Sequence, residues 1–99
     1  MSAPTPLPSP AAPPAPQAIL DGIADVARRH LDWRGELATG MRLVEDLRLD
    51  SLRLLTLAVE VEDRFRVALD EEDEAAIETV GDLVAVVGRK LAEREAEGR

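Results

Sequence analysis

The segment from residue 51 to residue 65 has more apolar positions than the core of one small domain can use. At 3.6 residues per turn, these positions divide into two stripes along a helix. The stripe that a small domain can bury consists of Leu54, Leu57, Ala58, Val61 and Phe65. The other stripe is offset from it and consists of Leu52, Leu55 and Val59. The pattern predicts a helix that packs on a core with one side and keeps a spare apolar ridge on another.

Three further segments have the features of helices. Residues 17–31 have apolar residues at helical spacing and end in Arg28, Arg29 and His30, where positive charge suits the helix dipole. Residues 79–92 begin with Thr79 and Asp82 in a capping-box-like arrangement and continue with an apolar stripe. The acidic residues 68–78 offer enough apolar surface for only one or two packed turns. No segment shows sustained strand alternation, so we predict an all-α fold, a small four-helix bundle with three main helices and one short helix.

Residues 32–48 have no sustained period and form a long predicted loop. We expect Trp33 to pin this loop to the core, with contact to a ligand as the alternative. Leu43 and Leu47 are predicted to anchor a short turn over residues 44–47.

The chain of 99 residues can hold one domain at most. All seven prolines lie between Pro4 and Pro16, in a stretch without charged side chains, which predicts a disordered Pro/Ala-rich tail over residues 1–16. The folded domain is expected over residues 17–92, followed by a polar, frayed C-terminus over residues 93–99. A domain of this size buries roughly 60% of its unfolded surface, which does not suffice for a deep enclosed active site.

The formal net charge is −8, and the segment from Met41 to Asp82 accounts for it, with 13 acidic residues against five arginines. Such a surface repels nucleic acid and anionic membranes and attracts basic patches on partner proteins. The alternative is an acidic surface that only aids solubility. No apolar run approaches the roughly 20 residues that span a bilayer, and the first 20 residues lack the pattern of a secretory signal.

The residue types present argue against metal and redox chemistry. Absence of cysteine excludes disulfides and thiolate sites and is compatible with the cytoplasm. His30 is the single histidine, and its position fits a partly exposed helix end. The acidic run 70–74 lacks the glycine and the alternation of an EF-hand loop, so no metal site is predicted.

Ser51 is the one candidate for covalent chemistry, and Asp50 before it is a good N-cap for the predicted helix. A hydrolytic role is excluded by the lack of a Gly-x-Ser-x-Gly elbow and of a histidine base nearby in sequence. Asp50 does not replace that base, because adjacent residues point to different sides of a helix. The chain is therefore not expected to be an enzyme. A hydroxyl at a helix N-terminus suits a phosphate attached by another enzyme, or else Ser51 is only a helix-start serine.

The stretch Glu45-Asp46-Leu47-x-x-Asp50-Ser51-Leu52 resembles the phosphopantetheine attachment site of acyl carrier proteins. Further along, Glu62-Asp63-x-Phe65 and Ile77-x-Thr79-Val80-x-Asp82-Leu83 follow at the spacing of that family. The resemblance covers about residues 18–92 and needs no gap from Glu45 to Leu83.

The resemblance implies that Ser51 carries 4′-phosphopantetheine, installed from coenzyme A by a separate phosphopantetheinyl transferase. The thiol of that arm would hold an acyl group as a thioester and present it to acyl-loading and acyl-processing enzymes. Asp50 would help to position the transferase's magnesium, and Ile77 would border an acyl-chain cleft. A monomer is expected, with a partner-binding face that consists of Leu52, Arg53, Leu55, Thr56, Val59 and Glu60.

Two departures from the family pattern bear on the pathway. Arg48-Leu49 stands where fatty-acid carriers usually have Gly-Ala or Gly-Leu, and Arg53 and Thr56 stand at positions that are normally acidic. A positive charge beside the arm changes which partner can dock, which favours a specialised pathway such as polyketide or related secondary metabolism. An aminoacyl or peptidyl carrier and an acidic helical adaptor with unmodified Ser51 remain the alternatives.

Overall fold

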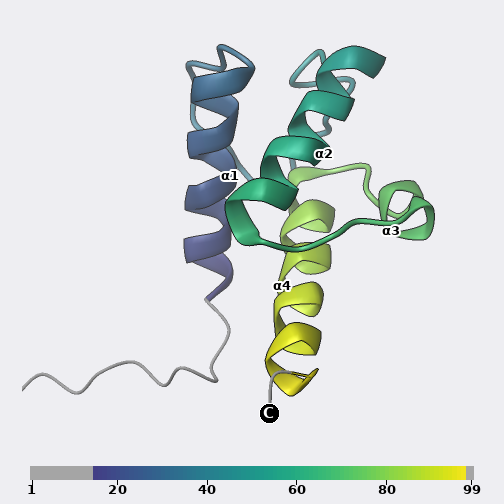
Figure 1. Ribbon diagram of the computed structural model, residues 1–99. Helices are drawn as coiled ribbons and strands as arrows, with labels where there is room; N and C mark the ends of the chain where they lie inside the picture. Colours follow the sequence, from purple (N-terminus) through teal and green to yellow (C-terminus); the bar gives the residue numbers. More distant parts are fainter. Residues whose placement is uncertain (1–14, 98–99) are drawn as a thin grey trace, which may run out of the picture.

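The computed structural model describes residues 15–97, which form a bundle of helices (Figure 1). The helices are α1 (Pro16–His30), α2 (Ser51–Phe65), α3 (Glu71–Ala75) and α4 (Val80–Glu97). Extended pairing in the described part of the chain is limited to an isolated bridge between Arg42 and Thr79. The predicted all-α fold with three main helices and one short helix is therefore confirmed. Most of the predicted tail, residues 1–14, lies outside the described residues.

Helix α1 packs against both α2 and α4, and α3 lies on the side of the bundle away from α1 (Figure 1). Helix α1 begins at Pro16, one residue before the predicted start, because proline suits the first turn, where no intrahelical donor is needed. Gly22 on α1 is buried against the ring of Phe65, and a Cβ at Gly22 would lie 2.6 Å from Phe65 Cζ. Glycine thus permits the close approach of α1 and α2. The buried core is formed by Ile19, Ile23, Val26, Ala27, Leu31, Leu43, Leu47, Leu49, Leu57, Val61, Val80, Leu83, Val84, Val87 and Leu91.

The long segment between α1 and α2 is fastened to the core at several points. Trp33 packs against the core, and its Nε1 donates to the carbonyl of Glu36 at 3.3 Å, as expected for a residue that pins the loop. Leu43 and Leu47 are buried on either side of a turn, which confirms their predicted anchoring role. The amide of Leu43 donates to the carbonyl of Glu78 at 3.0 Å, which links this segment to the start of α4. The segment that leads to Ser51 is therefore part of the packed structure.

Helix α4 begins with the predicted capping box. Asp82 N donates to Thr79 Oγ1 at 3.0 Å, and Thr79 N donates to Asp82 Oδ2 at 3.0 Å. The amide of Glu78 first, and then the amide of Thr79, donate to the carboxylate of Asp82 and lower its pKa.

The far end of α4 differs from the expected frayed end after Ala92, because the helix continues to Glu97. Its last residues favour the helix intrinsically, being Glu, Arg and Ala. Arg94 Nη1 also donates to the carbonyls of Phe65 at 3.0 Å and Arg66 at 2.8 Å, at the C-terminal end of α2. A tertiary contact thus orders a segment that looks merely polar in sequence.

The short helix α3 is held to α4 by Asp73, which is 4% exposed. Asp73 N donates to Asp70 Oδ1 at 2.8 Å, and Asp70 N donates to Asp73 Oδ2 at 3.1 Å, which completes a capping box. The carboxylate of Asp73 also pairs with Arg89 and, at 3.0 Å, with Lys90 Nζ. The amide of Asp70 first, and then Lys90, hold the pKa of Asp73 below its usual range. Sequence reasoning missed this residue, since nothing in a run of five acidic residues marks which one is buried.

Candidate functional site

Ser51 is the first residue of α2 and is exposed. Asp50 before it has an extended backbone, and its Oδ1 accepts a hydrogen bond from Arg53 N at 2.8 Å, which confirms the predicted N-cap. The amides of Ser51 and Leu52 precede the first intrahelical bond and need an acceptor outside the helix. A phosphate ester on Ser51 would meet these amides and the positive end of the helix dipole. The residues present therefore fit a phosphate-linked group at this hydroxyl.

The backbone before Ser51 is fixed by buried leucines. Leu47 and Leu49 are both in the core, and Leu49 N donates to the carbonyl of Leu43 at 3.1 Å. Arg48 between them has a φ of 59°, in the left-handed region that favours glycine. This turn lets two residues separated by one position both point inward, so that Asp50 and Ser51 emerge at a defined place on the surface.

The two apolar stripes of α2 differ in burial as the sequence predicts. Leu57 and Val61 are buried, and Leu54, Ala58 and Phe65 are partly buried. On the spare ridge, Leu52 is 71% exposed, Leu55 57% and Val59 48%. This ridge begins directly after Ser51. The exposed apolar residue Val44, in the turn before the site, was missed because a single apolar residue next to buried Leu43 has no sequence pattern that marks it as exposed.

The polar residues of the predicted partner face make contacts within the chain. Arg53 Nη1 donates to the carbonyl of Leu31 at 3.3 Å, at the C-terminal end of α1. Thr56 Oγ1 donates to the carbonyl of Leu52 at 3.0 Å, and Glu60 Oε1 lies 3.3 Å from His30 Nε2. The positive charge of Arg53 therefore lies at the C-terminal end of α1, where the helix dipole favours it.

An ion pair also joins α1 and α2, near the end of the ridge that lies away from Ser51. Asp25 on α1 pairs with Arg64 on α2 and also with Arg28 and Arg29 on its own helix. The hydrogen bond from Arg64 is the main reason that the pKa of Asp25 is lowered. The orientation of α2, and hence of Ser51, is thus fixed by charge as well as by packing.

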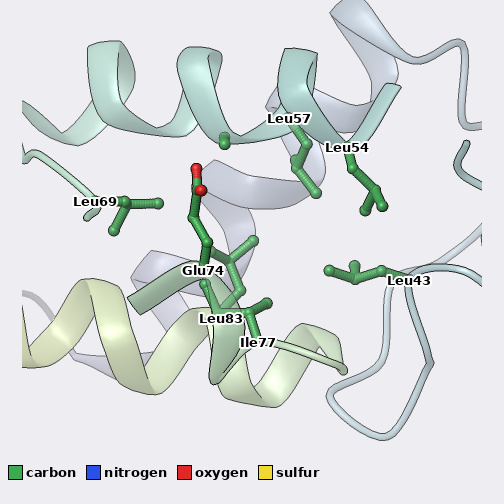
Figure 2. A pocket seen from close by; sticks show the side chains of 8 residues that line it. Leu43, Leu54, Leu57, Leu69, Glu74, Ile77 and Leu83 are labelled. Atoms are coloured by element: carbon green, nitrogen blue, oxygen red, sulfur yellow. The ribbon is translucent and has the colours of Figure 1, made fainter. Parts of the chain in front are cut away.

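A cleft of about 180 Å³ lies on the other side of α2, between α2, α3 and the start of α4 (Figure 2). Ile77, just after α3, is partly buried and lines it, in agreement with its predicted place at the border of a cleft. The one acidic side chain in the lining is Glu74, which sequence reasoning also missed. The lining residues are Leu43, Leu54, Leu57, Ala58, Leu69, Glu74, Ile77 and Leu83.

Residues 15–97 contain no group of three or more histidine, cysteine or acidic side chains placed to hold a metal ion. Across that same range, every helix is too short or too polar to cross a bilayer.

Comparison with known proteins supports the resemblance seen in the sequence. Residues 18–87 match the family described as "Phosphopantetheine attachment site". The meromycolate extension acyl carrier protein of Mycolicibacterium aurum is 35% identical over 82 residues, which are 82% of this chain and 84% of that protein. An acyl carrier protein of Kineococcus radiotolerans is 31% identical over 74 residues, 74% of this chain and 91% of that protein.

A solved structure of a candidate acyl carrier protein from Mycobacterium tuberculosis has a similar fold. It superposes with a TM-score of 0.57 at 38% sequence identity, and the match covers 73% of this chain and 92% of that one. The chain therefore belongs to the acyl carrier proteins, the family defined by a phosphopantetheine attachment site.

Proposed function

We propose that this chain carries an acyl group as a thioester on 4′-phosphopantetheine attached to Ser51, and presents it to partner enzymes without catalysing a reaction itself. The observation that carries this proposal is the exposed hydroxyl of Ser51 at the start of α2, capped by Asp50 and followed at once by an exposed apolar ridge. A hydrolytic serine would instead need a base, and the single histidine is paired with Glu60.

The residues around Ser51 have separate roles in this account. The Ser51 oxygen forms the phosphodiester, and the amides of Ser51 and Leu52 stabilise the phosphate charge. The Asp50 carboxylate orders the helix start through its bond to Arg53 N and helps to position the magnesium ion of the phosphopantetheinyl transferase. When bound, phosphopantetheine supplies a terminal thiol that holds the acyl group as a thioester.

The spare ridge of Leu52, Leu55 and Val59 is the surface that partner enzymes contact. Exposed apolar residues gathered beside a modification site are typical of a protein-binding surface. Arg53, Thr56 and Glu60 complete this face and contribute to specificity. The acidic side chains of α3 and its surroundings steer basic partners to the molecule, which acts as a monomer. The cytoplasm, expected from the sequence, supplies the coenzyme A that the modification consumes.

The pathway that we infer is a specialised one, such as polyketide or related secondary metabolism. Arg53 and Thr56 give the partner face a charge pattern that differs from the acidic one of fatty-acid carriers. Several relatives are named meromycolate extension acyl carrier protein, so meromycolate extension is a second candidate. The relatives' names do not favour the aminoacyl or peptidyl alternative.

The proposal is tested by intact mass after incubation with coenzyme A, magnesium and a broad-specificity phosphopantetheinyl transferase. We expect a gain of one phosphopantetheinyl group, which Ser51→Ala abolishes. Thr39→Ala is the matched control, because it removes an exposed hydroxyl outside the partner face and should leave the gain unchanged. An unchanged mass, under conditions that fully modify a known carrier, would contradict the proposal.

A further inference from the structure

We propose that Glu74 selects the acyl cargo that enters the cleft between α2 and α3, favouring chains that bear a hydroxyl group over saturated chains of the same length. This inference rests on the proposed function, because the cargo reaches the cleft only from a thioester arm on Ser51. It adds the chemical class of the cargo and the residue that distinguishes it.

The lining of the cleft is apolar except at Glu74. Leu54, Leu57 and Ala58 contribute its α2 wall, and Ile77 and Leu83 lie across from them. Figure 2 shows the Glu74 side chain extending across the cleft toward α2, with its carboxylate between Leu69 and Leu57. An acyl chain that enters the cleft therefore contacts this carboxylate.

The backbone of Glu74 is held in position by contacts that do not use its side chain. Asp73, the preceding residue, is buried and pairs with Arg89 and Lys90 on α4. Successive residues on a helix point in directions about 100° apart. Because the side chain of Asp73 is held toward α4, the side chain of Glu74 points in a different direction. Within residues 15–97, no ion pair engages the Glu74 carboxylate, which leaves its oxygens available to a ligand.

A saturated chain in the cleft would cover this carboxylate without offering a donor. Removing a charged group from water without a partner is unfavourable, so Glu74 would have to turn away to solvent or the chain would stay outside. A hydroxyl on the chain instead donates a charge-assisted hydrogen bond to Glu74. An ammonium group could donate as well, but its own charge would have to leave water to reach an otherwise apolar cleft. Because Glu74 is exposed, one bond to its carboxylate should favour the hydroxylated chain by only roughly tenfold in occupancy of the cleft.

The test compares octanoyl cargo with a series of hydroxyoctanoyl cargoes whose hydroxyl is moved along the chain. Each is loaded on the full-length protein from its coenzyme A thioester by the transferase, and intact mass verifies loading. The occupancy of the cleft is then read from the methyl NMR shifts of Leu54, Ala58 and Ile77 relative to the unloaded arm. We expect at least one hydroxylated isomer to occupy the cleft about tenfold more than octanoyl.

Two variants separate the role of Glu74 from the general acidity of α3. Glu74→Leu should abolish the preference and admit octanoyl, whereas Glu72→Leu, an exposed position on the same helix outside the lining, should keep the preference. The inference is overturned if octanoyl occupies the wild-type cleft as well as every hydroxylated isomer does. It is also overturned if the preference survives in Glu74→Leu. A protein that cannot be loaded would instead contradict the proposed function, so the two failures are distinguishable.

Discussion

At the scale of single residues, Arg48 has a backbone conformation that is unfavourable for any residue with a Cβ. Its φ of 59° lies in the left-handed region, which costs a non-glycine residue roughly 1–2 kcal/mol. The glycine that fatty-acid carriers usually have here would avoid this cost. We predict that Arg48→Gly raises the free energy of unfolding by about 0.5–1 kcal/mol, the gain being reduced by the greater freedom of glycine in the unfolded chain.

The measurement is urea denaturation, with Arg48→Ala as the matched control. Alanine removes the same side chain but keeps the Cβ, so it should leave stability within about 0.5 kcal/mol of the wild type. If the glycine and alanine variants are equally stable, the left-handed backbone at position 48 does not lower the stability of the wild type.

Asp50 has two roles that substitution can separate. Asp50→Ala removes the acceptor for Arg53 N and should lower the free energy of unfolding by about 1 kcal/mol. Asp50→Asn keeps an acceptor of good capping strength, so most of that stability should return. Both variants lose the carboxylate charge, and we therefore expect both to slow modification by the transferase. Full modification rate in Asp50→Asn would show that the charge is not needed.

At the scale of the elements, the two stripes of α2 predict different costs for the same substitution. Leu57 is 3% exposed, and Leu57→Ala should cost about 2–5 kcal/mol of unfolding free energy. Leu55→Ala on the spare ridge should change it by less than about 0.5 kcal/mol and weaken binding to the transferase. Chemical denaturation and a binding titration distinguish the two effects. If Leu55→Ala destabilises as much as Leu57→Ala, the assignment of the ridge to partners is wrong.

The attachment of α3 to α4 should make stability sensitive to acid. Because the folded pKa of Asp73 lies below its ordinary value of 3.8, the ionised form stabilises the fold above that value. This contribution is lost as the pH falls through the lower folded pKa. The stability of Asp73→Asn, measured by urea denaturation at a series of pH values, should therefore lie below the wild type at neutral pH and approach it in acid. A constant difference between the two proteins at every pH would contradict this assignment.

How far the elements could be predicted depends on where their stability originates. The periods that predict α1, α2 and α4 arise from stripes such as Ile19, Ile23 and Val26, which are buried as expected. The limits of α3 and the extension of α4 to Glu97 depend instead on tertiary contacts, through Asp73 and Arg94. Such contacts join residues far apart in sequence, and no local pattern reveals them.

At the scale of the whole molecule, one part of the site lies within a single stretch of sequence, and the other part is assembled from segments far apart in the chain. Ser51, Asp50 and the ridge lie within one helix and its cap, so a contiguous motif predicts them. The cleft is assembled from α2, α3, the start of α4 and the turn near Leu43, and therefore Glu74 could not be recognised before these elements were placed together. The contact of Arg53 with Leu31 is likewise visible only once α1 and α2 are packed.

The most direct test of the central claim is to locate phosphopantetheine on the modified protein by peptide mass. Trypsin cleaves after Arg48 and Arg53 and releases residues 49–53, in which Ser51 is the only hydroxyl-bearing side chain. The account predicts that this peptide gains the mass of one phosphopantetheinyl group and that every other peptide keeps its unmodified mass. An unmodified peptide 49–53 from protein that has gained the group elsewhere would contradict the assignment of Ser51.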